Sequence, residues 1–222
     1  MLLKRCEVCG APVQRGFLCE ACWQKLEKES YDFSFERCDS CCSIVPFPGY
    51  ECRFCEERPG FRLYIICPYE GFARKMVEDL KFNGNRGIAS VLSDIFNKTI
   101  GKAGLLGETA VIPVPASRDG IRKRGFDQMK LVSKGIDVKV LDLLEMCESS
   151  QQKQLDRAGR IEKMGSIFKL KRKSIPASIS NLIVIDDICT TGATLFSAME
   201  LFRNTGKNVM GMAFLGNYSQ WN

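Results

Sequence analysis

The chain has 222 residues, of which 45% are hydrophobic and 26% are charged, as is ordinary for a globular protein. No apolar run approaches the roughly 18 residues that cross a bilayer, and the N-terminus lacks an apolar core of signal-peptide length. We therefore expect no membrane span and a cytoplasmic location. Histidine is absent, which excludes a Ser-His-Asp triad and histidine-ligated metals. The net charge of +6 suits an anionic ligand such as a phosphate ester or nucleic acid.

The cysteines are concentrated at the N-terminus, where nine of the twelve lie within the first 55 residues. CEVC and CEAC are separated by nine residues, and CDSC and CRFC by ten. Two C-x2-C pairs joined by a hairpin-length spacer present four thiolates to a tetrahedral zinc ion. We expect a small zinc-ribbon domain over residues 1–60 with one or two structural Zn²⁺ sites. The predicted ligands are Cys6, Cys9, Cys19, Cys22, Cys38, Cys41, Cys52 and Cys55.

A disulfide framework is the alternative for the same cysteines. It requires an oxidising compartment, and nothing in the sequence targets the chain to one. Four thiolates leave no open coordination position, so the zinc would be structural. We interpret Cys67, Cys147 and Cys189 as ordinary half-buried thiols, with the hypothesis that oxidation of Cys189 disturbs phosphate binding.

From residue 61 to residue 222, strand and helix patterns alternate. Strands are expected at 61–70 (leading into a helix), 110–115, 166–173, 181–187 and 207–218, and a strand or short helix at 139–147. Helices are expected at 72–82, 88–100, within 117–136 after a basic loop, and at 191–206, where Gly206 ends the helix. This alternation predicts an α/β fold with an open, mainly parallel sheet flanked by helices. Ligands of such sheets bind beyond the carboxyl ends of the strands.

One strand end carries an unusual pattern, NLIVIDDICTTGATL at residues 181–195. The N–H groups at a helix N-terminus suit a phosphate, and so do the hydroxyls and the glycine of the segment Thr190, Thr191, Gly192, Ala193 and Thr194. Asp186 and Asp187 would be repelled by the phosphate, but each carboxylate can accept hydrogen bonds from a ribose diol. The pattern predicts a ribose-phosphate site. The alternative is a solvated strand end followed by a threonine helix cap.

Several segments carry a resemblance to known families. IVIDDICTTGAT resembles the phosphoribosyl pyrophosphate (PRPP) motif of type I phosphoribosyltransferases. LKFNGN, IPVPASRDGIRKRGFDQ and QKQLDRAGRIEKMGSIF resemble segments of the ComF family, which is competence-associated and amidophosphoribosyltransferase-like. The cysteine-rich N-terminus resembles that family's double zinc ribbon, so the resemblance covers nearly the whole chain. It implies a type I phosphoribosyltransferase fold at residues 61–222. Asp127 and Lys163 depart from the family, which usually has asparagine at the first position and often at the second, and Asp127 adds negative charge to a site for a polyanion.

The resemblance also implies roles for individual residues. Asp186 and Asp187 would be catalytic and hold the ribose diol, and the segment from Thr190 to Thr194 would bind the 5'-phosphate. The residues implied to bind pyrophosphate are Val114, Pro115, Ala116, Ser117, Arg122, Arg124 and Gly125. Residues 148–163 would form a flexible loop, with Gln152 and Arg160 as its best-supported polar positions. Lys81 either approaches the site or is a surface lysine.

The function implied is a Mg²⁺-dependent PRPP-binding protein associated with DNA uptake in natural competence. The reaction would displace pyrophosphate from C1' of PRPP by a nucleophile that no residue identifies. Two other classes stay open: a factor that binds single-stranded DNA through basic and aromatic residues of the ribbon, and a PRPP sensor without turnover. Other competence proteins are possible partners, and the oligomeric state is open.

Overall fold

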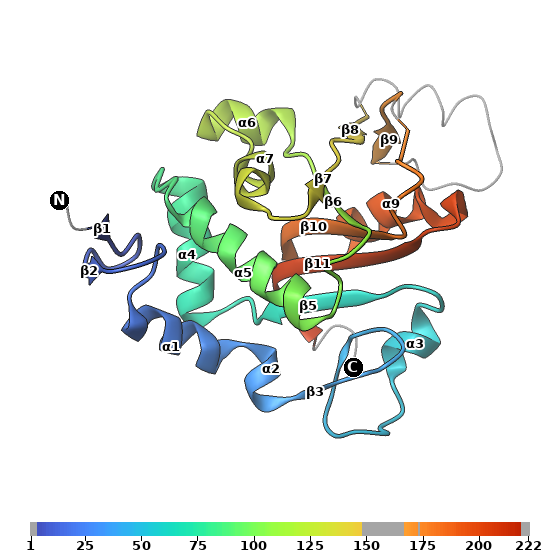
Figure 1. Ribbon diagram of the computed structural model, residues 1–222, viewed down its shortest axis with the longest axis horizontal. Coiled ribbons are helices and arrows are strands. Elements are labelled where there is room, and N and C mark those ends of the chain that lie inside the picture. Colours follow the sequence, from blue (N-terminus) through green and yellow to red (C-terminus); the bar gives the residue numbers. More distant parts are fainter. Residues whose placement is uncertain (1–3, 148–166, 173, 219–222) are drawn as a thin grey trace.

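The computed structural model describes residues 4–147, 167–172 and 174–218. Its centre is a sheet of five parallel strands in the order β5-β11-β10-β6-β7 (Figure 1). These strands are β5 (Leu63–Cys67), β6 (Thr109–Pro113), β7 (Lys139–Val140), β10 (Asn181–Cys189) and β11 (Asn208–Gly216). In the register of the central strand, Ile185 of β10 lies opposite Pro113 on one side and Met212 on the other. The expected α/β class with a parallel sheet is confirmed.

Helices cover both faces of this sheet, as the alternation of side chains along β10 requires. Ile183 and Ile185 of β10 pack in a hydrophobic cluster with α4 (Gly71–Phe82), α5 (Ile88–Lys102) and α7 (Gln128–Val132). Leu182 and Val184 face the opposite side, in a cluster with α9 (Ala193–Glu200). The remaining elements of this part are α6 (Arg118–Arg124), the 3-10 turns η1 (Ser133–Gly135) and η2 (Arg203–Thr205), and the antiparallel pair β8 (Leu144–Met146) and β9 (Phe168–Leu170).

The N-terminal part consists of two small hairpins joined by helices. The first hairpin pairs β1 (Lys4–Arg5) with β2 (Pro12–Val13) and is followed by α1 (Glu20–Glu29) and α2 (Tyr31–Ser34). The second pairs β3 (Glu36–Arg37) with β4 (Ile44–Val45) and is followed by α3 (Arg53–Glu57). Cys22 packs in the cluster on the α4 face of the sheet, whereas Phe54 packs in the cluster on the α9 face. The two hairpins therefore contribute to different faces. The division at residue 60 remains a prediction.

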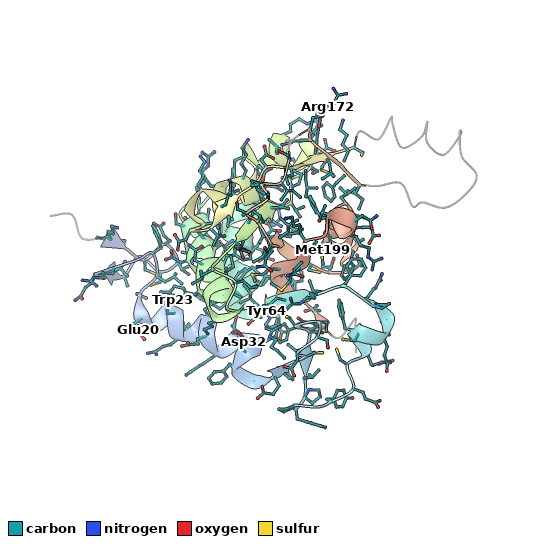
Figure 2. All side chains as sticks on the ribbon, turned by 45° about the vertical axis from the view of Figure 1, so that its right-hand side comes forward. Glu20, Trp23, Asp32, Tyr64, Arg172 and Met199 are labelled. Atoms are coloured by element: carbon teal, nitrogen blue, oxygen red, sulfur yellow. The ribbon has the colours of Figure 1, made fainter. Side chains whose placement is uncertain are left out.

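A polar network anchors the second hairpin to the sheet. Arg37 donates to Asp32, to the hydroxyl of Tyr218 and to the carbonyl of Ile65 in β5. Tyr64 donates to Asp32 over 2.5 Å, and both side chains are labelled in Figure 2. The guanidinium of Arg37 also lies 3.8 Å from the centre of the Tyr64 ring. Because this arginine is largely enclosed, its several partners compensate for the loss of water.

Several element boundaries differ from the expected ones, and the larger differences are these. The helix expected to reach Gly206 ends at Glu200, and η2 connects it to Gly206, whose φ of 69° reverses the chain. Residues 117–136 form two short helices, because Gly125 at φ 77° ends the first. Residues 139–147 contain β7 and β8, and β10 continues beyond residue 187 to Cys189. Within the described residues, no helix combines the length and the apolar character that a bilayer crossing needs.

Candidate functional site

Asp186 and Asp187 lie near the end of β10, at the carboxyl edge of the sheet, and both are buried. Oδ1 of Asp186 accepts the N–H of Asp187 over 2.9 Å. Oδ2 of Asp187 is buried and has no hydrogen-bond partner among the described residues. A buried carboxylate oxygen without a donor is costly in free energy, so this oxygen is a favourable acceptor for an added hydroxyl or N–H group.

Lys81 pairs with one of these acids. Its Nζ lies 2.9 Å from Oδ1 of Asp187, and the side chains of Lys81 and Asp187 are only 14% and 4% exposed. The structure therefore places Lys81 at the site rather than on the open surface, in the last turn of α4. Burial, followed by the charge of Asp187, raises the pKa of Asp186 well above its ordinary value, and Lys81 opposes that rise.

The predicted phosphate segment follows directly after β10. Gly192 has a φ of 73° and precedes the first residue of α9, so its left-handed conformation forms the turn into the helix. Thr190, Thr191 and Thr194 are exposed. The hydroxyl of Thr191 accepts the N–H of Ala193 over 3.4 Å. Three exposed threonines thus lie next to the buried acids, at the start of an eight-residue helix.

The predicted pyrophosphate loop, which we define as residues 113–117 and call the pyrophosphate loop below, leaves β6 next to these acids. β6 and β10 are neighbours, and the N–H of Val114 donates to the carbonyl of Ile185 over 2.9 Å. The Val114 side chain is buried, so only its backbone can face a ligand. Pro115 and Ala116 are half-buried, and Ser117 accepts the N–H of Gly120 as the cap of α6.

The predicted arginines of α6 already have partners. Arg122 forms an exposed ion pair with Asp119. Arg124 donates to Oε1 of the buried Gln128 over 2.8 Å, and its Nε is buried without a partner among the described residues. Gly125 serves the fold, because its left-handed conformation ends α6. Gln152 and Arg160 lie outside the described residues.

One contact was missed by the sequence interpretation. The two carboxylate oxygens of Asp127 accept the N–H groups of Ala116 and Lys130, each over 3.0 Å. Asp127 therefore joins the pyrophosphate loop to the first turn of α7. An aspartate immediately before a helix is a recognisable cap signal in the sequence, but the link to Ala116 depends on the fold.

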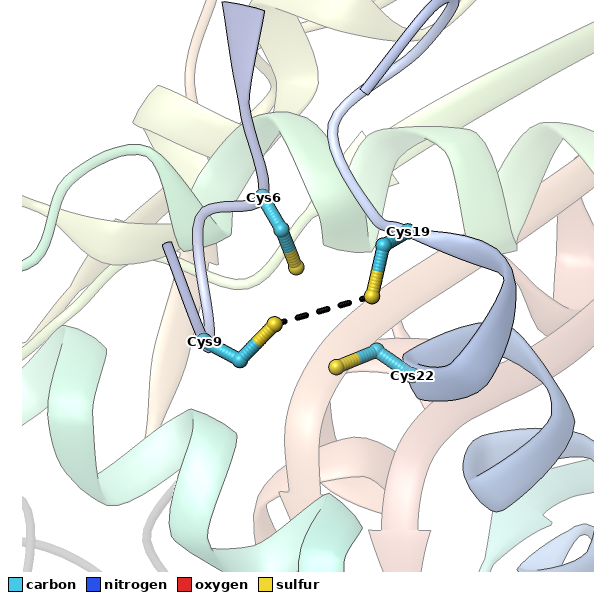
Figure 3. Close-up of side chains that lie close together, drawn as sticks. All are labelled: Cys6, Cys9, Cys19 and Cys22. Atoms are coloured by element: carbon cyan, nitrogen blue, oxygen red, sulfur yellow. Dashed lines mark hydrogen bonds between the residues drawn. The ribbon is translucent and has the colours of Figure 1, made fainter. Parts of the chain in front are cut away.

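The eight paired cysteines form two clusters, each with all four sulfur atoms within 4.8 Å of one another. Figure 3 shows the first cluster, in which Cys6, Cys9, Cys19 and Cys22 point toward a common centre from a hairpin and the start of α1. The second cluster consists of Cys38, Cys41, Cys52 and Cys55. The turn after Cys9 uses Gly10 at φ 74°, and the corresponding turn after Cys41 uses Cys42 at φ 64°. Cys42 thus has a backbone role in the second turn.

The sulfur distances suit a metal centre better than disulfides. The distances are 3.6 Å for Cys9 and Cys19, 3.7 Å for Cys38 and Cys55, and 3.4 Å for Cys41 and Cys52. A disulfide needs about 2.05 Å, whereas four thiolates about 2.3 Å from zinc are separated by about 3.8 Å. All cysteines are free thiols here. Cys67 and Cys189 are fully buried rather than half-buried, and Cys147 is half-buried.

Comparisons with known proteins agree with the family resemblance. The competence protein ComFC of Streptococcus pneumoniae is 26% identical over 191 residues, which cover 85% of this chain and 82% of that protein. ComFC of Bacillus subtilis is 28% identical over 142 residues, 64% of this chain and 58% of that protein. These relatives and the two four-cysteine clusters confirm the resemblance to the ComF family. No protein-family model matches the chain.

A solved structure also aligns with the chain. The hypoxanthine phosphoribosyltransferase of Staphylococcus aureus aligns with a TM-score of 0.35 and 17% identity, over 60% of this chain and 65% of that one.

Proposed function

We propose that the chain binds PRPP, with its ribose diol at Asp186 and Asp187 and its 5'-phosphate at the segment from Thr190 to Thr194. The observation that supports this most is Oδ2 of Asp187, a buried acceptor without a donor among the described residues. It lies at a strand end that continues directly into exposed threonines and a left-handed glycine. A ribose hydroxyl supplies the missing donor, and the phosphate that it carries suits the helix N-terminus.

Magnesium is part of this proposal. The donor set fits Mg²⁺, which prefers oxygen ligands and is usually held by one or two carboxylates together with substrate phosphates. The pyrophosphate loop lies at the end of the strand next to β10, so a Mg²⁺ ion carried by the pyrophosphate would lie near these carboxylates. Magnesium would neutralise charge on the pyrophosphate of PRPP, whereas Asp186, Asp187 and Lys81 belong to the ribose half of the site.

The two cysteine clusters are proposed to hold structural zinc. Each cluster offers four thiolates, which complete the four-coordinate shell of zinc and leave no open position for a catalytic role. Because one cluster packs with each face of the sheet, zinc would stabilise the sheet from both sides.

The relatives connect this site to competence. Since they are named competence proteins, we propose that the chain acts in DNA uptake, as an enzyme that transfers the phosphoribosyl group or as a PRPP-binding regulator. Release of pyrophosphate from PRPP in the presence of an acceptor would establish an enzyme. Tight PRPP binding without such release would establish a regulator.

Binding of ribose 5-phosphate tests the site independently of the pyrophosphate half. We expect calorimetric titration to detect binding to the wild-type chain and roughly tenfold weaker binding to Thr194→Val, which removes one hydroxyl donor. Thr205→Val is the matched control, because its hydroxyl donates to the carbonyl of Phe202 beyond the far end of α9. Equal affinity of Thr194→Val and wild type would contradict the proposed phosphate segment.

Binding of single-stranded DNA is a second candidate, supported by exposed aromatic rings in the segment between β4 and α3. Phe47 and Tyr50 are 57% and 45% exposed and form an edge-to-face pair with ring centres 5.3 Å apart. Phe33 and Phe35 are also exposed, whereas Phe54 is buried in the core. Exposed rings suit base stacking. If this candidate is right, Phe47→Ala with Tyr50→Ala lowers affinity for an oligothymidylate probe, and wild-type affinity falls with salt.

A further inference from the structure

Asp127 occupies the N–H group that a pyrophosphate ligand would be expected to use. In the pyrophosphate loop, the N–H of Ala116 donates to Oδ2 of Asp127 over 3.0 Å. Backbone N–H groups of a short loop at a strand end are typical donors for phosphate oxygens. Here a carboxylate of the chain itself accepts that hydrogen bond, so an anion must compete with Asp127 for this N–H.

The contact requires a carboxylate. The second oxygen, Oδ1, accepts the N–H of Lys130 as the cap of α7. An asparagine has one acceptor oxygen and one amide nitrogen, which only donates. If the new side chain of an Asp127→Asn variant kept the cap with its oxygen, its amide would face the N–H of Ala116, so this N–H would lose its acceptor. The substitution would therefore break the hydrogen bond between residues 116 and 127. It would leave two donors there, the N–H of Ala116 and the new side-chain amide, that an anion could use.

The charge of Asp127 also reaches the ribose half of the site. Burial and the charge of Asp187 are the main causes of the raised pKa of Asp186, and the negative charge of Asp127 adds to them. The site thus contains three carboxylates within electrostatic range, and Lys81 is paired with Asp187. Arg122 and Arg124 of α6 already have partners in Asp119 and Gln128.

We propose that Asp127 makes the pyrophosphate loop selective for a diphosphate complexed with a divalent cation over the free polyanion. This inference rests on the proposed function and concerns the selectivity of the same site. A free diphosphate meets a like charge and a loop N–H that is already occupied. A diphosphate that carries a divalent cation brings positive charge that can interact with Asp127. The carboxylate can then release the N–H of Ala116, because the cation offsets the repulsion between the carboxylate and the diphosphate.

The test is a titration of inorganic pyrophosphate at low and at saturating Mg²⁺ into wild type and Asp127→Asn. Because the variant removes one like charge near the loop, we expect it to bind free pyrophosphate roughly tenfold more tightly. The difference in affinity between the variant and the wild type should become smaller when Mg²⁺ saturates the pyrophosphate. Asparagine caps helices as well as aspartate does, so α7 should be retained. Asp127→Ser, another capping residue without charge, should also gain affinity for free pyrophosphate.

Glu200→Gln is the matched control, because it removes the same charge from an exposed position at the end of α9. It should leave pyrophosphate binding unchanged. Equal affinity of wild type and both Asp127 variants for free pyrophosphate, or no binding under any condition, would overturn the inference. A parallel titration of ribose 5-phosphate separates the two proposals. If the wild type does not bind ribose 5-phosphate, the proposed function is contradicted. If Asp127→Asn binds free pyrophosphate with the same affinity as the wild type, only this inference is contradicted.

Discussion

Lys81 of α4 and Asp187 of β10 form an ion pair over 2.9 Å between a helix and the central strand of the sheet. At its other end, α4 contacts Glu29 of α1, whose two carboxylate oxygens accept the N–H groups of Phe72 and Ala73 over 2.8 and 2.9 Å. One end of the helix is thus bound to the helix that follows the first cysteine hairpin, and the other end to the site. The first cysteine cluster and the proposed ribose site are therefore connected through α4.

Replacing Lys81 by methionine should affect both stability and ligand binding. The change leaves Asp187 as a buried charge without its cation, which typically costs about 3–5 kcal/mol. We expect the free energy of unfolding in urea to fall by about 3 kcal/mol and ribose 5-phosphate binding to weaken. Lys75→Met on the exposed side of the same helix should change stability by less than about 0.5 kcal/mol. A stable Lys81→Met with full affinity would show that the pair serves neither role.

Asp186→Asn should become more stable than wild type as the pH rises. Burial, and then Asp187, raise the pKa of Asp186, so between the ordinary carboxyl pKa and this raised value the folded chain binds more protons than the unfolded chain. The free energy of unfolding of the wild type therefore falls as the pH rises through that window. Asparagine cannot titrate, so the stability of the variant does not fall with pH for this reason. Urea unfolding of both proteins from acidic to neutral pH measures the difference, and a constant difference would contradict the burial argument.

Metal analysis should find two zinc ions per chain. We expect Cys22→Ser and Cys41→Ser each to lose one ion, because each removes a buried ligand of a different cluster. Chelation of both ions should unfold the sheet as well as the hairpins, since the clusters pack on its two faces. Cys147→Ser, outside both clusters, should keep both ions. A protein that is fully folded after complete chelation would point to structure independent of zinc.

Cys189 should resist alkylation and peroxide in the folded protein. Burial, followed by the charge of Asp186, raises its pKa to about 12, so hardly any reactive thiolate is present at neutral pH. The half-buried Cys42 and Cys147 should react before the buried Cys67 and Cys189, all four of which lie outside the clusters. Mass spectrometry of iodoacetamide-treated protein measures the order. Early modification of Cys189 would mean that the end of β10 opens readily, and the hypothesis of oxidative control through this residue would regain support.

The local sequence predicted the elements that depend on periodicity and on short motifs. The strand before Asp186, the helix over residues 72–82 and the cysteine pairs all carry their signals within a few residues. Contacts between distant segments were not predictable in the same way. Lys81 and Asp187 are separated by 106 positions, and only the packing of α4 on the sheet brings them together. The role of Asp127 toward Ala116 likewise depends on how two short helices turn after β6.

Titration of PRPP with Mg²⁺ into wild type and into the double variant Asp186→Asn/Asp187→Asn tests the central claim most directly. Both substitutions keep the side-chain shape, and circular dichroism with zinc analysis would verify that the variant is folded. We expect clear calorimetric binding by the wild type that is lost in the variant. Equal binding by both proteins, or none by a folded, zinc-loaded wild type, would contradict a ribose-phosphate site at the end of β10.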